Sequence, residues 1–256
     1  MQEYLIRQVA FLSKFGARAA CLAAGLTVAT MTDAATPTVQ APRDLQQVNL
    51  HQLVVTNEQV ANLIAGLMGI ERDLLLGQLF LQEGMVSAEG SHFAHPRRDN
   101  FPVIKDGLAA AGAPDLEPAL IALENAKTRE EVNAAYLAAL GEVEKAKQAL
   151  QPSDQDLLSA VIATTSAGAE MLDPSGSTDI VSYQECWGLL MIARDQLDML
   201  VLSEDAMVKQ AAIKMVLAFD DVILGLPDPA SNGSVAIDPM PVEALIESMR
   251  SNLSDL

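Results

Sequence analysis

The sequence has few cysteines, histidines and aromatic residues, and these shortages narrow the sites to expect. Among 256 residues there are two cysteines, three histidines and one tryptophan, and aromatic side chains make up 4%. The motifs G-x-S-x-G, H-E-x-x-H, Walker A, G-x-G-x-x-G and C-x-x-C-H are missing. Covalent c-type haem is therefore excluded. No pair of a nucleophile and a base is visible, so enzyme activity is the least favoured class of function.

Residues 1–35 have the organisation of a secretory signal peptide. Three basic residues precede an uncharged stretch at 19–32, and small residues follow it. The uncharged stretch is shorter than the roughly 20 residues that a membrane span requires. We therefore predict a signal peptide cleaved near Ala34 or Ala35, and a periplasmic or secreted protein with no integral membrane segment after cleavage. The alternative is an uncleaved membrane anchor.

Cleavage of this peptide removes Cys21 and leaves Cys186 as the last cysteine. No intramolecular disulfide can then form, even in an oxidising compartment. Cys186 lies within an apolar helical run, which predicts a buried thiol with a structural role.

The chain is strongly acidic. Its net charge is −18, and residues 1–35 carry three basic and two acidic side chains, which leaves −19 for residues 36–256. Such a surface repels nucleic acid and anionic lipid, so no nucleic-acid partner is expected. Acidity alone does not indicate a metal site, because a solvated acidic face is its ordinary explanation.

The pattern of the remaining chain predicts an all-α fold. Residues 36–54 show no sustained period and form an extended leader. Residues 55–256 form a single domain, an antiparallel bundle of about seven to eight helices. A 3.6-residue apolar stripe predicts the first helix from Thr56 to about Gln82. No convincing strand alternation is present.

Capping residues and turns set the other expected boundaries. Thr128-x-x-Glu131 and Ser153-x-x-Asp156 are capping boxes. Around the histidines we expect a short helix that ends before Pro96, because proline disfavours helical backbone in the residue before it. The remaining helices are expected at about 102–111, from 115 onward, 128–151, 153–172, 178–202, 205–225 and 241–252, with a polar connection at 97–100 and a loop at 225–240.

The segment Glu89-x-x-His92-x-x-His95-Pro holds two of the three histidines. Imidazoles three residues apart on one helical turn can reach one ion at about 2.0–2.2 Å. We predict a divalent metal site (iron, copper or zinc) at His92 and His95, with Glu71 of the first helix and Glu89 as carboxylate ligands. Two alternatives remain open: imidazoles that interact with a helix C-terminus, or a hydrogen-bonded histidine at a hairpin corner.

Two other metal chemistries are less favoured. A ferritin-like di-iron centre needs two Glu-x-x-His motifs, and the chain has one. Met68 and Met85 precede the histidines, and thioethers suit Cu(I), but core packing explains methionines in helices better.

A second cluster, Tyr183-Gln184-Glu185, lies in a later helix beside Gly188. Acids are rarely buried without a partner, so an inward-facing Glu185 would need one. We predict that Tyr183, Gln184 and Glu185 line a pocket or support the metal site. The alternative is ordinary core with an exposed polar edge.

These motifs resemble those of a group of bacterial periplasmic helical proteins that carry a His-x-x-His-Pro segment after a long first helix and a later Tyr-Gln-(Asp/Glu) helix. More loosely, Gly90-x-His92-x-x-His95 is similar to the Gly-x-His-x-x-Glu motif of imelysin-like periplasmic proteins, with histidine in place of glutamate. The resemblance implies a helical, metal-related binding protein. We expect a periplasmic protein that holds a divalent metal or a metal-bearing ligand. The alternative is an acidic structural module that docks an envelope protein.

Overall fold

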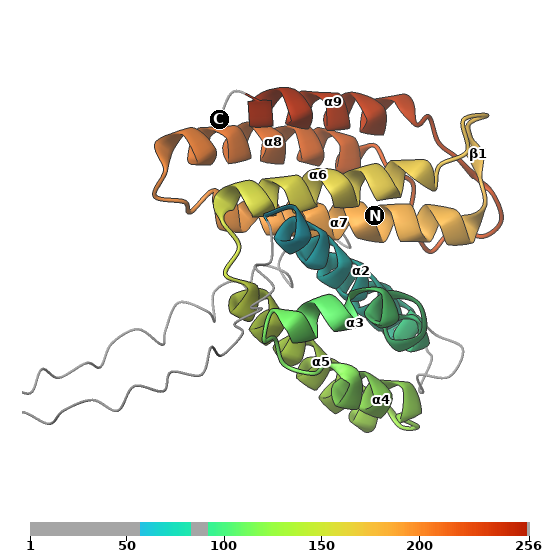
Figure 1. Ribbon diagram of the computed structural model, residues 1–256. Helices are drawn as coiled ribbons and strands as arrows, with labels where there is room; N and C mark the ends of the chain where they lie inside the picture. The colour runs from blue at the N-terminus through green and yellow to red at the C-terminus, as the bar shows by residue number, and fades with distance from the viewer. Residues whose placement is uncertain (1–56, 83–91, 255–256) are drawn as a thin grey trace, which may run out of the picture. The chain divides into compact units, whose positions relative to one another are not determined.

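The computed structural model describes residues 57–82 and 92–254. The predicted signal peptide and leader, and Glu89, lie outside these residues. Eight α-helices pack against one another in the described part of the chain, as the sequence predicted (Figure 1). They are α2 (Asn57–Gln82), α3 (Phe101–Ala110), α4 (Glu117–Asn125), α5 (Arg129–Leu150), α6 (Asp154–Glu170), α7 (Ile180–Leu200), α8 (Ala206–Leu224) and α9 (Met240–Ser254).

Side-chain caps explain several of these boundaries. Both predicted capping boxes are present: the Thr128 side chain accepts from the backbone N–H of Glu131, and Ser153 accepts from Asp156 in the same way. Asp179 and Asp205 cap α7 and α8 through bonds to two backbone N–H groups each. Each cap satisfies donors that the first helical turn leaves without partners.

Helix α2 is the central element. It contacts α3 and α5 as well as α6 and α7, and much of its length is buried. Figure 1 shows α6, α7, α8 and α9 side by side, and α7 contacts both α6 and α8 while α9 contacts the same two helices. Because α2 is covered by several helices, polar side chains on it must find partners inside the protein.

Between residues 92 and 110 the chain is helical without interruption. A 3₁₀ turn η2 (His92–Ala94) leads through His95 into a π turn η3 (Pro96–Asn100), which continues as α3. The predicted helix end before Pro96 and the polar connection at 97–100 are therefore wrong. Pro96 lies in the first turn of η3, where a missing backbone N–H leaves no intrahelical bond unmade.

This segment runs antiparallel to α2, and glycines allow the close approach. A Cβ atom on Gly66 would collide with Ile104, one on Gly69 would lie 3.0 Å from Asn100 Oδ1, and one on Gly77 would collide with the Phe93 ring. These three contacts follow one another in order along the two antiparallel segments. Asp73, between Gly69 and Gly77, therefore faces the stretch that holds the histidines.

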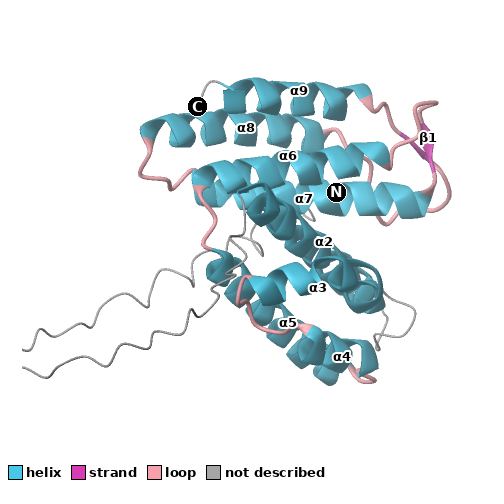
Figure 2. Cartoon of the chain, in the orientation of Figure 1, coloured by secondary structure: helices cyan, strands magenta, loops and turns pink. Residues whose placement is uncertain are grey.

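The structure also has two short strands, which the sequence pattern did not reveal. Strand β1 (Ser177–Thr178) pairs antiparallel with β2 (Val235–Ala236), so that Ser177 lies opposite Ala236 and Thr178 opposite Val235 (Figure 2). Two residues are too few to show the period-2 alternation of a strand, which explains why the pattern gave no signal. The pair fastens the loop after α8 to the start of α7.

Among the described residues, no helix is long and apolar enough to cross a membrane.

Candidate metal centre

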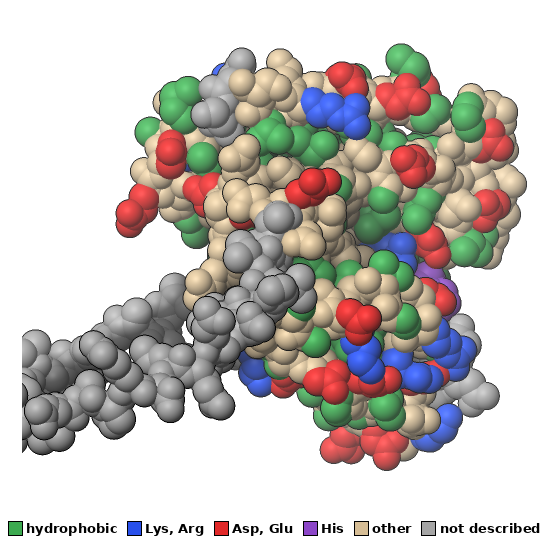
Figure 3. Space-filling model, in the orientation of Figure 1, with side chains coloured by type: hydrophobic (Ala, Val, Ile, Leu, Met, Phe, Trp, Pro, Cys, Tyr) green, Lys and Arg blue, Asp and Glu red, His purple; other side chains and the backbone are tan. Residues whose placement is uncertain are grey.

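Three side chains from two segments bring metal-binding atoms together. Asp73 of α2, His92 of η2 and His95 offer one ligand atom each, and these atoms lie within 4.8 Å of one another. Asp73 is fully buried, His92 is 9% exposed and His95 is half-buried. The two predicted histidines are therefore side by side, and the carboxylate beside them is Asp73. Figure 3 shows histidine at the protein surface next to acidic and basic side chains.

The Asp73 carboxylate is held in one orientation by two neighbours. Its Oδ1 accepts from Arg72 Nε at 3.0 Å and from a terminal nitrogen of Arg72 at 2.7 Å. Its Oδ2 accepts from Asn100 Nδ2 at 2.6 Å. A hydrogen bond such as that from Asn100 orients the carboxylate ligands of metal sites, whereas Arg72 occupies Oδ1, the oxygen that lies 3.9 Å from His92 Nδ1.

The His92 imidazole is fixed by packing on both sides. Its ring stacks on Phe80 with centroids 5.3 Å apart, and it meets the His95 ring edge-on at 4.9 Å. Its Nδ1 atom is buried and has no hydrogen-bond partner among the residues that the structure describes. Asp73 Oδ1 lies 3.9 Å from this nitrogen, which is too long for a hydrogen bond.

The same distance suits two ligands of one ion. Donors that bind one ion at about 2.1 Å lie roughly 3.0–4.2 Å apart, depending on the bond angle. The His92 Nδ1 and Asp73 Oδ1 atoms fall within this range. The arrangement of all three donors can therefore accept a metal ion with small movements of side chains.

Glu71, predicted as a ligand, lies elsewhere. Both of its carboxylate oxygens accept from Lys147 Nζ of α5, at 2.8 and 2.7 Å, and Lys147 also donates to Gln196. Burial raises the pKa of Glu71, and the Lys147 ammonium opposes that rise. The structure therefore engages Glu71 in an ion pair between helices and does not bring it into the donor group.

The predicted Tyr-Gln-Glu cluster divides between two roles. The Tyr183 hydroxyl donates to the Pro227 carbonyl, and Gln184 Nε2 donates to the Pro229 carbonyl at 2.8 Å, so both hold the loop after α8. Glu185 instead lies 3.6 Å from a terminal nitrogen of Arg72. The Arg72 side chain therefore links Glu185 to Asp73, one of the three candidate metal ligands.

The sequence-based prediction missed Asp73, Arg72 and Asn100. One signal was available: Glu71, Arg72 and Asp73 are consecutive charged residues inside a run of apolar residues. Charges in such a run are rarely buried without partners, and the partners must come from another segment.

Cys186 and Met68 have structural surroundings. Cys186 is a free, buried thiol, and burial raises its pKa to about 12, which suppresses the reactive thiolate. Met68 is buried, and its sulfur accepts from Thr164 Oγ1 at 3.5 Å. Neither side chain offers the reactive environment of a catalytic or copper-binding residue.

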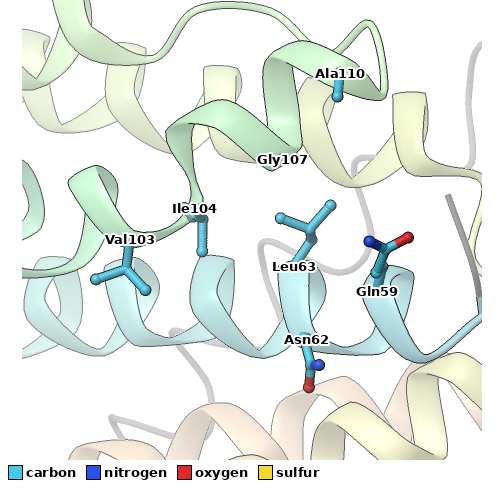
Figure 4. Close-up of a pocket in the computed structure, with 7 residues that line it drawn as sticks. All are labelled: Gln59, Asn62, Leu63, Val103, Ile104, Gly107 and Ala110. Carbon is cyan, nitrogen blue, oxygen red and sulfur yellow. The ribbon is translucent and has the colours of Figure 1, made fainter. Parts of the chain in front are cut away.

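A separate pocket opens between α2 and α3. The residues that line it are Gln59, Asn62, Leu63, Val103, Ile104, Gly107 and Ala110 (Figure 4). None of these side chains titrates, so this pocket offers no acid, base or charged metal ligand. The candidate site remains the group at Asp73.

The chain matches no protein-family model, no curated protein and no solved structure.

Proposed function

We propose that the protein binds a divalent transition-metal ion through His92, His95 and Asp73. The observation that carries this proposal is the buried Nδ1 atom of His92, which has no hydrogen-bond partner in the described part of the chain and lies 3.9 Å from Asp73 Oδ1. Leaving a buried polar atom unsatisfied costs about 1–3 kcal/mol. A bound ion satisfies this nitrogen and uses the carboxylate beside it.

The donor set indicates the class of metal. Imidazole nitrogens suit zinc, copper, iron and nickel, whereas magnesium and calcium prefer oxygen ligands alone. Two histidines and one carboxylate therefore favour the first group. Three protein donors also leave a coordination position for water or for a donor atom of a second molecule.

The proposed setting is the periplasm or the outside of the cell. The pattern of residues 1–35 supports export, and the resemblance to periplasmic helical proteins supports a role in holding a metal or a metal-bearing ligand. A binding protein is favoured over an enzyme because the one free thiol among the described residues is buried and has a raised pKa.

Calorimetry tests the metal proposal. The purified protein is titrated with Zn²⁺, Cu²⁺ and, without oxygen, Fe²⁺, in parallel with the variant His92→Ala/His95→Ala. We expect binding of one ion by the wild type and its loss in the variant. Equal, weak binding by both proteins contradicts the proposal.

A second candidate function is docking of an envelope protein. Its support is an apolar face on α8, where Leu217 is 62% and Leu224 is 72% exposed at a spacing of seven residues. Crosslinking of a partner that survives loss of both histidines but not Leu217→Glu would favour this function.

A further inference from the structure

The Arg72–Glu185 pair lies beside the proposed metal ligands and is not explained by them. We propose that the Arg72 guanidinium and the metal ion compete for the Asp73 carboxylate, and that Glu185 receives the guanidinium when the ion binds. This inference rests on the proposed metal function and describes how that site is regulated. Three observations support it: Arg72 binds the Asp73 oxygen that lies near His92, the Glu185 carboxylate lies within reach of Arg72, and a bound ion changes the net charge of these side chains.

Arg72 occupies the oxygen that faces the imidazoles. Two of its nitrogens donate to Asp73 Oδ1, at 3.0 and 2.7 Å, and the same oxygen is 3.9 Å from His92 Nδ1. Asn100 holds the other oxygen. A carboxylate oxygen has two lone-pair sites, so an ion that binds Oδ1 must displace at least one Arg72 donor.

Glu185 offers the displaced donor a second place. Its carboxylate lies 3.6 Å from a terminal nitrogen of Arg72 and is 25% exposed, whereas Asp73 is fully buried. A shift of the guanidinium toward Glu185 closes this gap to a hydrogen bond. Because Glu185 keeps some contact with water, it also carries its charge at a lower desolvation cost than Asp73 does.

The packing of α7 fixes the stem of Arg72 and leaves its head between the two acids. A Cβ atom on Gly188 would lie 2.8 Å from Arg72 Cγ, so the absence of a side chain there creates the channel for the stem. Gly188 is three residues beyond Glu185 on the same helix and therefore on the same face. Helix α7 thus provides both the channel and the acceptor.

The charges support an exchange. Without an ion, one guanidinium faces two carboxylates, a net charge of −1 with neutral imidazoles. A divalent ion changes this to +1. Uncompensated buried charge is unfavourable, so the ion binds more weakly with Arg72 present and more tightly with Glu185 present.

The experiment measures affinities for Zn²⁺ by competition with a chromophoric chelator, in the full-length protein. Relative to wild type we expect Arg72→Gln to bind about tenfold more tightly and Glu185→Gln about tenfold more weakly, shifts of the size that outer-shell changes produce. In the double variant, the effect of Glu185→Gln shrinks, because the side chain through which it acts is missing. Glu170→Gln removes the same charge from an exposed position on α6 and serves as the control.

A purely structural role for the pair predicts a different pattern, in which both variants lower thermal stability and neither raises affinity. Unchanged or weaker binding by Arg72→Gln overturns the exchange. If Arg72→Gln does not fold, the Zn²⁺ affinity of Glu185→Gln tests the proposal by itself, because the partly exposed Glu185 side chain tolerates replacement. In that case, an affinity of Glu185→Gln equal to that of Glu170→Gln overturns the proposal. Failure of wild type itself to bind Zn²⁺, Cu²⁺ or Fe²⁺ overturns the metal function and this inference together.

Discussion

Two buried carboxylates on α2, two residues apart, lie in opposite situations. Glu71 has both oxygens bound by the single ammonium of Lys147. Asp73 has its oxygens divided between Arg72 and Asn100. Two imidazoles lie close by, and Nδ1 of His92 has no hydrogen-bond partner within 57–82 and 92–254. Residues two apart on a helix point to different sides, so α5 and α7 surround the first carboxylate and the histidine segment faces the second.

This difference shows how burial alone misleads. Both acids are buried, and both have a basic partner. The Glu71 pair is complete, because its acceptors and donors match within the protein. In the Asp73 group, the described hydrogen bonds leave His92 Nδ1 unsatisfied, and this difference from the Glu71 ion pair supports the proposed binding site.

The largest expected effect is the difference in Zn²⁺ affinity between Asp73→Asn and Glu71→Gln. Asp73→Asn removes a proposed ligand, so we expect a loss of Zn²⁺ affinity beyond the roughly 10–100-fold that an outer-shell change costs. Glu71→Gln should leave the affinity unchanged. Calorimetry measures the Zn²⁺ affinity of both variants, and circular dichroism verifies that they fold. Equal loss in both would abolish the distinction between the two acids.

Removal of Lys147 should affect stability without affecting the metal. Lys147→Met leaves Glu71 buried without its cation, and breaking a buried pair in this way costs about 3–5 kcal/mol. The control is Lys145→Met on the same helix, where the exposed pair with Glu142 contributes about 0–1 kcal/mol. Urea unfolding measures both. A loss no greater than that of the control would show that the Glu71 pair contributes little.

The pH dependence of this loss has a definite sign. Lys147 lowers the pKa of Glu71, so its removal lets burial raise that pKa further above the ordinary value of 4.5. An acid whose folded-state pKa is raised stabilises the fold when it takes up a proton. The penalty in Lys147→Met should therefore be absent below pH 4.5 and grow as the pH rises through the raised pKa. Unfolding curves across this range check it.

Asn100→Leu tests the support of Asp73 with a smaller expected effect. Leucine has a similar shape and cannot donate to Oδ2, so we expect Zn²⁺ affinity to fall about tenfold. Asn125→Leu is the control, because Asn125 donates only to a backbone carbonyl of its own helix. The d–d spectrum of bound Co²⁺ should change in the first variant and not in the second.

Two glycine substitutions give the smallest effects. Gly69→Ala places a Cβ atom 3.0 Å from Asn100 Oδ1, so it should displace that side chain and weaken Zn²⁺ binding. Gly141→Ala in α5 meets open space and should stabilise the protein by about 0.5–1 kcal/mol, the helix preference of alanine over glycine. Thermal unfolding measures the stability of Gly141→Ala, and chelator competition measures the Zn²⁺ affinity of Gly69→Ala. Tighter binding by Gly69→Ala would contradict the role of close packing at this position.

The helical class and most helix boundaries could be predicted, because local signals determine them. The capping boxes at Thr128 and Ser153 lie where the pattern placed them. The helix end predicted before Pro96 was wrong, because the packing of a continuous helix against α2 outweighs the backbone preference of the residue before proline. The strands were too short for a period to show.

The site was predictable only in part. The spacing of His92 and His95 is a local signal, and the structure does bring them together. Whether Glu71 or Asp73 meets the histidines depends on which side of α2 the histidine segment covers. That side is decided by the contacts of Gly69 and Gly77, which no pattern within α2 alone can reveal.

The π turn at Pro96–Asn100 affects how the histidines are oriented relative to α3. A π turn amounts to one residue inserted into an α-helix, which offsets the side chains before it from those after it by about a quarter of a turn. Here the offset separates His92 and His95 from the apolar residues of α3. Deletion of a single residue from this turn would restore a regular helix. Such a deletion would turn His92 and His95 relative to α3, so the π turn contributes to the position of the two histidines beside Asp73.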